Sequence, residues 1–238
     1  MRILIGYSMR SGSTLLQHVL DGHSQIEAYG DLSSVGALLR RATGLADRTH
    51  LCIKPMDLLY LQPGHGFYRH FDRFVWIARD PRDSYLSALE SGYAYLLWPP
   101  GRRREGIDLG LLRRWQRVYH RHYFAQPERW HLLRYEDLVS APAPTLARLL
   151  RYLGVAQEPL FPFPQFKRRH GGDYKLRQHR TISTGSRERH RGQLTARQED
   201  VFEEVLGEDM AALGYWPGRV GGVKQASPPA WPADRRRA

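Results

Sequence analysis

The first residues suited to chemistry are Arg10, Ser11, Gly12, Ser13 and Thr14, which follow a short apolar run near the start of the chain. Small and hydroxyl residues that open a helix direct backbone N–H groups and the positive end of the helix dipole at one point, which favours a phosphate or sulfate. The Arg10 guanidinium would add paired donors for a tetrahedral anion. The loop is therefore predicted to bind an anion. The alternative is a tight turn in which Ser13 or Thr14 caps the helix.

This loop differs from the nucleotide-binding pattern G-x-x-x-x-G-K-S/T, because Ser11 stands where that pattern has glycine and Gly12 where it has lysine. Phosphoryl transfer assisted by Mg²⁺ therefore loses support. A nucleotide or small-molecule kinase stays as an alternative function.

A second anion site is predicted in the segment RDPRDSYLS, residues 79–87. Arg79 ends an apolar run, and ligands of open parallel sheets bind at the carboxyl ends of the strands. Ser87 lies on the helix that follows, where the turn can bring it back toward Arg79. The alternative is that Arg79 forms a structural ion pair and that Ser87 is solvated.

Short apolar runs alternate along the chain with stretches of helical periodicity. Strands are predicted over 3–7, 51–53, 74–78 and 131–134, and helices over 15–20, 84–89, 111–123, 145–153 and 196–213. This alternation predicts an α/β fold around a parallel sheet. The aperiodic segments 93–110 and 161–191 are predicted to be lid loops.

Length and composition limit the class of protein. A chain of 238 residues with 42% hydrophobic residues can form one α/β domain and is not disordered as a whole. No apolar run approaches the roughly 20 residues of a membrane span, so a cytoplasmic protein is expected. Cys52 is the single cysteine, which excludes an internal disulfide and a cysteine-based zinc site.

The net charge of +12 is concentrated in two segments. Residues 162–192 hold nine Lys and Arg against two acids, and residues 217–238 hold five against one. We therefore predict a domain over 1–216 and a disordered basic tail over 217–238. Nucleic-acid binding, a further alternative, is not expected because no predicted helix has a basic recognition face.

Four segments resemble, in the right order, landmarks of the sulfotransferases that use 3′-phosphoadenosine 5′-phosphosulfate (PAPS). They are MRSGST for the 5′-phosphosulfate loop, RDPRDSYLS for the 3′-phosphate motif, LLRYEDLVSAP for a strand followed by acids, and STGSRERHRGQLT for a late basic loop. The resemblance extends over about residues 2–216. It implies a P-loop NTPase-like, three-layer α/β/α fold with a central parallel sheet of about five strands, plus lid loops.

The resemblance also implies which residues bind PAPS. Residues 10–14 would hold the 5′-phosphosulfate, and Arg79 and Ser87 the 3′-phosphate. The late loop departs from the pattern, because His190 and Arg191 stand where many members have Trp-Arg. Its candidates for the nucleotide are Arg187, Arg189 and Arg191.

Sulfuryl transfer needs a base for the acceptor proton and cations for the leaving phosphate. Asp31 is the predicted base, because it follows Gly30 where the carbohydrate and tyrosyl-protein members carry Glu. The alternatives are that Asp31 caps a helix, or that His23 or His50 acts as the base, as a histidine does in cytosolic members. His23 is interpreted as structural.

Lys54 is predicted to stabilise the leaving phosphate together with Arg10, and the alternative is a lysine that extends to solvent at the sheet edge. Glu136 and Asp137 could be paired catalytic carboxylates by their sequence alone, but the resemblance implies that they anchor loops. No metal site is predicted, because His120-x-His122 is not accompanied by H-E-x-x-H or clustered acids.

The acceptor, a hydroxyl or amine of a small molecule or carbohydrate, is left open. Aromatic residues at 93, 95 and 98 favour an apolar acceptor, whereas arginines at 102–104 favour an anionic one. The arginine-rich composition is typical of a bacterial protein. Monomer and homodimer both remain possible, and so does a degenerate member that binds nucleotide without transferring sulfate.

Overall fold

The computed structural model describes residues 1–30, 36, 49–55, 65–91, 101–160 and 184–215. Its centre is a five-stranded parallel sheet with the order β2-β3-β1-β4-β7. The strands are β1 (Arg2–Tyr7), β2 (Ile26–Gly30), β3 (His50–Lys54), β4 (Arg73–Ala78) and β7 (His131–Arg134). The predicted α/β fold with a sheet of about five strands is confirmed.

Four strands lie where the apolar runs predicted them, because residues buried on both faces of a parallel sheet are apolar throughout. Sequence reasoning missed β2, which has Glu27 in its interior. This carboxylate is buried and accepts a hydrogen bond from the Tyr29 hydroxyl. A pairing partner two residues along the same strand thus offsets the cost of burying the acid.

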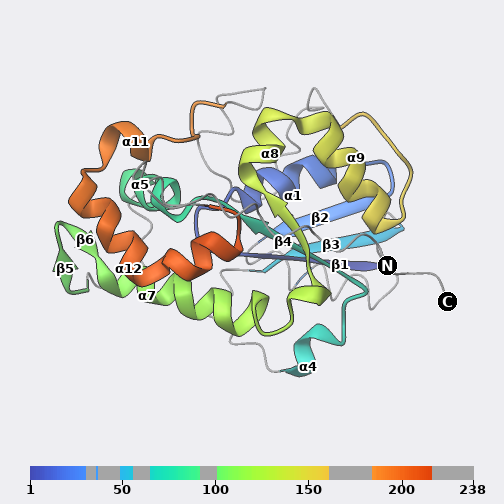
Figure 1. Ribbon diagram of the computed structural model, residues 1–238. Coiled ribbons are helices and arrows are strands. Elements are labelled where there is room, and N and C mark those ends of the chain that lie inside the picture. The colour runs from blue at the N-terminus through green and yellow to red at the C-terminus, as the bar shows by residue number, and fades with distance from the viewer. Residues whose placement is uncertain (31–35, 37–48, 56–64, 92–100, 161–183, 216–238) are drawn as a thin grey trace.

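Helices cover both faces of the sheet (Figure 1). Ile3 and Ile5 of β1 pack with one set of helices, and Leu4 packs with the other, as the alternation of side chains along a strand requires. The first face is covered by α1 (Ser13–Asp21), α8 (Tyr135–Ser140) and α9 (Pro142–Leu153), and the second by α4 (His65–Tyr68), α7 (Leu109–Val118) and α12 (Ala196–Ala212). The three-layer architecture is that of the prediction.

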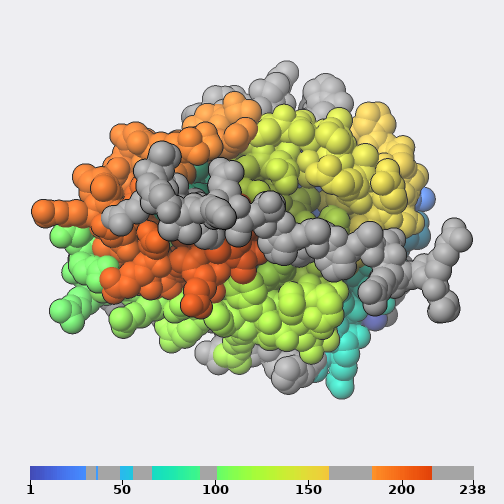
Figure 2. Space-filling view, viewed as in Figure 1, coloured from blue at the N-terminus to red at the C-terminus, as the bar shows by residue number. Residues whose placement is uncertain are grey.

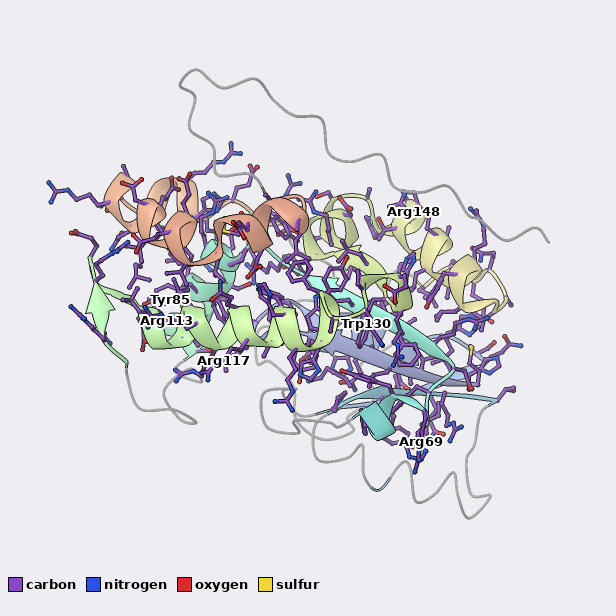
Figure 3. The ribbon with its side chains drawn as sticks, turned by 60° about the horizontal axis from the view of Figure 1, so that its bottom comes forward. Arg69, Tyr85, Arg113, Arg117, Trp130 and Arg148 are labelled. Atoms are coloured by element: carbon purple, nitrogen blue, oxygen red, sulfur yellow. The ribbon has the colours of Figure 1, made fainter. Side chains whose placement is uncertain are left out.

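Aromatic rings fill the second layer. Trp76 of β4 packs against Trp130 with ring centroids 5.2 Å apart, and Tyr85 of α5 (Pro81–Ser91) packs against Phe202 of α12 at 5.5 Å. Figure 3 shows Tyr85 and Trp130 at different positions along this layer. Tilted and edge-on pairs of this kind add to the stability that burial of the rings provides.

The helix predicted over 111–123 changes character within the structure. The α-helix α7 ends at Val118, and the chain continues as one π-helical turn, η1 (Tyr119–Tyr123). Single π turns often occur near functional sites. Here the turn places the Tyr119 hydroxyl 3.0 Å from the hydroxyl of Ser8, at the end of β1.

The described parts of the two predicted lids contain short regular elements. The first contains a short hairpin of β5 (Arg103–Arg104) and β6 (Ile107–Asp108), and the second leads into α11 (His190–Gln193). Figure 2 shows residues 184–215, coloured orange to red, next to the green surface that α7 provides. Asp31, the aromatic positions 93, 95 and 98, and the tail over 217–238 lie outside the described residues.

Among the helices that the structure describes, none is both long enough and apolar enough to cross a bilayer.

Candidate functional site

The loop between β1 and α1 lies at the carboxyl edge of the sheet. Two of its residues have left-handed backbones, Arg10 with φ 63° and Gly12 with φ 88°. A Cβ at Gly12 would also overlap the ring of Tyr135. Position 12 therefore requires glycine for two reasons, the left-handed backbone and the lack of space for a side chain. A left-handed arginine is unusual, and such strain persists where the surrounding structure enforces it, often at binding sites.

Gly12 is the N-cap of α1, and no side chain among the described residues caps this helix. The alternative interpretation of Ser13 or Thr14 as the cap is therefore wrong. The free N–H groups of the first helical turn are thus available to a ligand.

Ser11 at the centre of this loop is fully buried. Its N–H donates to the carbonyl oxygen of Ser8 at 3.3 Å, which closes the turn. Its hydroxyl has no hydrogen-bond partner among the described residues. A buried hydroxyl without a partner costs free energy, and a ligand oxygen would remove that cost.

The second predicted motif meets the first loop directly. Nε of Arg10 donates to Oγ of Ser87 at 3.1 Å, and Nη1 of Arg79 donates to the carbonyl oxygen of Arg10 at 3.2 Å. Ser87 is buried, so the interpretation of Ser87 as a solvated residue is wrong. Two segments about 70 residues apart in the sequence therefore form one cluster of donors.

Arg79 is only 4% exposed at the end of β4. Its guanidinium lies over the ring of Tyr135, with Cζ 4.6 Å from the ring centroid. It makes no ion pair with a described acid, contrary to the structural alternative, and its Nε has no hydrogen-bond partner among the described residues. A buried cation held by the Tyr135 ring and by the carbonyl oxygens of Arg10 and Ser186 is suited to binding an anion.

Lys54 ends β3 at the same edge and is only 3% exposed. Its Nζ lies 5.0 Å from the centroid of the Tyr7 ring. The alternative of a lysine extended to solvent is therefore wrong. In the sheet register Lys54 is paired with Gly30, the residue that precedes Asp31.

The two histidines considered as alternative bases lie at the opposite edge of the sheet. His23 precedes β2, receives a hydrogen bond on Nδ1 from the Gln25 N–H at 3.0 Å, and donates from Nε2 to the Ala156 carbonyl oxygen at 2.9 Å. His50 begins β3, with Nδ1 3.4 Å from the amino group of Met1. A strand of five residues spans roughly 16 Å, so neither histidine reaches the loop after β1.

The late basic loop reaches the same cluster of donors. Nη2 of Arg79 donates to the carbonyl oxygen of Ser186 at 2.5 Å. The backbone N–H and ring Nδ1 of His190 both donate to Oδ1 of Asp83, at 3.0 and 2.9 Å. The structure thus brings residues 186–190 onto β4 and α5.

The three arginines of this loop have different environments. Arg187 donates to the Ser140 hydroxyl at the end of α8, and Arg189 forms an ion pair with Glu90 of α5. Arg191 has a 70% exposed side chain and pairs with Glu188 within its own turn. The structure therefore brings Arg187 and Arg189, but not the Arg191 side chain, onto elements that carry the site.

Two buried acids, Asp83 and Glu136, accept hydrogen bonds from the segments that form the site. Burial opposes ionisation of Asp83, but the hydrogen bonds from His190 and the charge of Arg79 outweigh it and lower its pKa. Burial raises the pKa of Glu136, which accepts hydrogen bonds from the Asp80 N–H at 3.0 Å and the Tyr215 hydroxyl at 2.8 Å. Glu136 thus anchors the turn after β4, which agrees with its interpretation as a structural residue.

Sequence reasoning missed three residues of this site: Tyr135, Asp83 and His190. The spacing of Asp83 four residues before Ser87 could have indicated a shared helix face. The described residues contain no group of three or more His, Cys, Asp or Glu that could hold a metal ion.

In the comparison with protein families, residues 72–159 match the model of the sulfotransferase family. This region includes Arg79, Ser87 and the strand β7. The resemblance to sulfotransferases is confirmed. Comparison with curated proteins gave no match.

Solved sulfotransferases share the fold of this chain. The sulfotransferase domain of the curacin biosynthetic pathway superposes with a TM-score of 0.63 at 20% identity, covering 86% of this chain and 96% of that domain. The domain of the Synechococcus PCC 7002 olefin synthase gives 0.58 at 17% identity, covering 88% and 94%. Mouse sulfotransferase SULT7A1, solved in complex with PAP, gives 0.54 at 14% identity, covering 88% and 84%.

Proposed function

We propose that this protein transfers a sulfuryl group from PAPS to a hydroxyl or amine of a small-molecule or carbohydrate acceptor. The observation that carries the proposal is the hydrogen bond between Arg10 and Ser87. It joins the loop expected to bind the 5′-phosphosulfate to the helix expected to bind the 3′-phosphate. A donor with anionic groups at both ends is the ligand that such a junction suits best.

The residues present fit this donor. Ser11 Oγ and Arg79 Nε are buried polar atoms without hydrogen-bond partners among the described residues, and both can donate to phosphate oxygens. Gly12 keeps the loop free of a Cβ that would overlap Tyr135. The shared fold with a sulfotransferase solved with PAP adds support.

Each residue has a distinct task in this proposal. PAPS, when bound, supplies the sulfuryl group and a phosphate leaving group. Arg10 and the N–H groups at the start of α1 hold the phosphosulfate, while Arg79 and Ser87 hold the 3′-phosphate and fix the register of the nucleotide. Lys54 places a buried ammonium where negative charge develops, and a charge held in a site of low dielectric constant stabilises the transition state strongly.

Asp31 is proposed as the base that accepts the proton of the acceptor. The support is topological, because Asp31 follows Gly30, which is paired with Lys54 at the carboxyl edge of the sheet. Both histidine alternatives lie at the other edge. A carboxylate there would have the role that general bases have in related reactions.

A thermal-shift titration tests the donor. A ligand that binds the folded state raises the melting temperature by mass action, so 3′-phosphoadenosine 5′-phosphate (PAP) should raise it, and AMP should raise it much less. Arg79→Ala should abolish most of the shift with PAP. Arg129→Ala is the matched control. The Arg129 guanidinium also lies over aromatic rings, with Cζ 5.1 Å from the centroid of the Tyr68 ring. Arg129 precedes β7, however, so it lies at the amino edge of the sheet, away from the proposed site.

The outcomes separate the candidate functions. A shift with ATP and Mg²⁺ but none with PAP would favour a kinase instead. A shift with PAP and no sulfuryl transfer to any of a panel of alcohols, sugars and amines would favour a nucleotide-binding protein without catalysis.

A further inference from the structure

One face of α5 contacts both loops of the site. Asp83, Ser87 and Glu90 follow each other at spacings of four and three residues, so their side chains share one side of the helix. Ser87 contacts Arg10 of the first loop. Asp83 and Glu90 contact His190 and Arg189 of the late loop.

The contact between Asp83 and His190 is the most buried of these. Asp83 is 1% exposed and His190 is 4% exposed. One carboxylate oxygen accepts both the backbone N–H and the ring N–H of the same histidine, so the contact fixes the backbone as well as the side chain. Hydrogen bonds to a buried carboxylate are stronger than those between neutral groups.

The other carboxylate oxygen of Asp83 has no hydrogen-bond partner among the described residues. The charges of Arg79 and Arg189 both act on Asp83. Asp83 is therefore a buried anion that attracts the arginine at the end of β4 and an arginine of the late loop.

We propose that Asp83 and His190 form a latch that positions residues 184–191 against Arg79 and thereby shapes the site for the 3′-phosphate of the nucleotide. Both are positioning residues, because they act through Arg79 and the loop. The proposal rests on the proposed function in one respect, namely that Arg79 binds a 3′-phosphate.

Ser186 connects the contact between Asp83 and His190 to Arg79, because it belongs to the same loop as His190 and contacts Arg79. Its carbonyl oxygen accepts one N–H of Arg79, while the carbonyl oxygen of Arg10 accepts another. Together these bonds set the plane of the guanidinium over Tyr135. If His190 releases Asp83, the loop loses its buried attachment and Ser186 no longer holds that plane.

The test compares His190→Ala with His190→Asn, whose side-chain amide can still donate to Asp83. Affinities for PAP and for AMP are measured by calorimetry, and amide hydrogen exchange over residues 184–193 is measured without nucleotide. His190→Ala should weaken PAP binding about tenfold, which is the loss of one charge-assisted hydrogen bond, and leave AMP binding unchanged. His190→Asn should recover most of the loss.

His120→Ala is the matched control. His120 donates from Nε2 to the buried carboxylate of Asp209 in α12 at 2.8 Å, so His120→Ala also removes a contact between a histidine and a buried acid, although the His120 side chain is 58% exposed. This variant should change neither the ratio of the two affinities nor hydrogen exchange in 184–193. Asp83→Asn, a second variant, keeps an acceptor for the backbone N–H and should lower the ratio as His190→Ala does.

Equal ratios of PAP to AMP affinity in His190→Ala and the wild type would overturn the latch, and so would an Asn variant no better than Ala. If the wild type binds neither nucleotide, the proposed function fails. In that case hydrogen exchange still tests whether the contact between Asp83 and His190 attaches the loop to α5. Faster exchange in His190→Ala than in His120→Ala supports it, and equal exchange overturns it.

Discussion

Gly12 combines two demands on a single residue. Its φ of 88° disfavours any side chain, and a Cβ would overlap Tyr135. We expect Gly12→Ala to lower the free energy of unfolding by about 2–4 kcal/mol, as strain and overpacking do together. Urea denaturation measures it.

Gly154 provides the comparison. Its φ of 72° is also left-handed, but a Cβ there would meet no atom within 4 Å. Gly154→Ala should cost about 1 kcal/mol, the backbone part alone. Equal losses for the two variants would show that Tyr135 does not restrict the loop.

Asp31 allows a kinetic prediction. Asp31→Ala should leave PAP affinity nearly unchanged and lower turnover by roughly a hundredfold or more, because a general base acts on the acceptor rather than on the nucleotide. Thermal shift with PAP and release of PAP in the presence of a working acceptor measure the two quantities. Turnover at the wild-type level would remove Asp31 from the mechanism.

At the scale of elements, α12 begins with a reciprocal cap. The Thr195 hydroxyl accepts from the Gln198 N–H at 3.3 Å, and the Gln198 side chain accepts from the Thr195 N–H at 2.9 Å. We expect Thr195→Ala to destabilise the protein by about 1 kcal/mol. Thr195→Ser keeps the hydroxyl and should therefore retain most of the stability that the cap provides. Thermal unfolding of both variants measures the cap, and equal melting temperatures would argue against it.

Strands and helices could be predicted where the sequence carries one clear pattern of apolar residues. Apolar runs located four strands, and helical periodicity located the main helices. The strand β2 was missed because Glu27 interrupts its apolar pattern, although its partner Tyr29 lies only two residues further along the same strand. The helix α8 was missed because its six residues are too few to show a period.

The site was predictable in its local parts. The position of Arg10 just after the first strand and the spacing of Ser87 from Arg79 are local features of the sequence, and both indicated anion binding. The contact between Asp83 and His190 could not be predicted, because 107 residues separate the partners and no local pattern encodes such a pairing. The same holds for Tyr135, whose role as a platform for Arg79 depends on the order of the strands.

At the scale of the whole molecule, the buried acids make stability depend on pH. Asp83 has a lowered pKa, so its ionised form stabilises the folded protein above its ordinary value of 3.8, and this contribution is lost as the pH falls below it. The destabilisation caused by Asp83→Asn should therefore be large at pH 7 and smaller at pH 3. Urea denaturation at both pH values measures the difference.

Asp209→Asn should show the opposite dependence on pH, because the pKa of Asp209 is raised whereas that of Asp83 is lowered. Burial raises the pKa of Asp209 in spite of its contact with His120. Ionisation of Asp209 therefore opposes folding as the pH rises, and the cost of Asp209→Asn should shrink toward neutral pH. A cost that changes in the same direction for both variants would contradict this assignment.

The strand order also has a consequence for synthesis of the chain. β1 is synthesised before β3 and β4, yet it lies between them in the sheet. Both of its edges stay unpaired until residue 54 has emerged, and one stays open until residue 78. The nascent chain therefore carries an exposed strand edge while the segments between are made, which is the stage at which pairing with another chain, and hence aggregation, competes with folding.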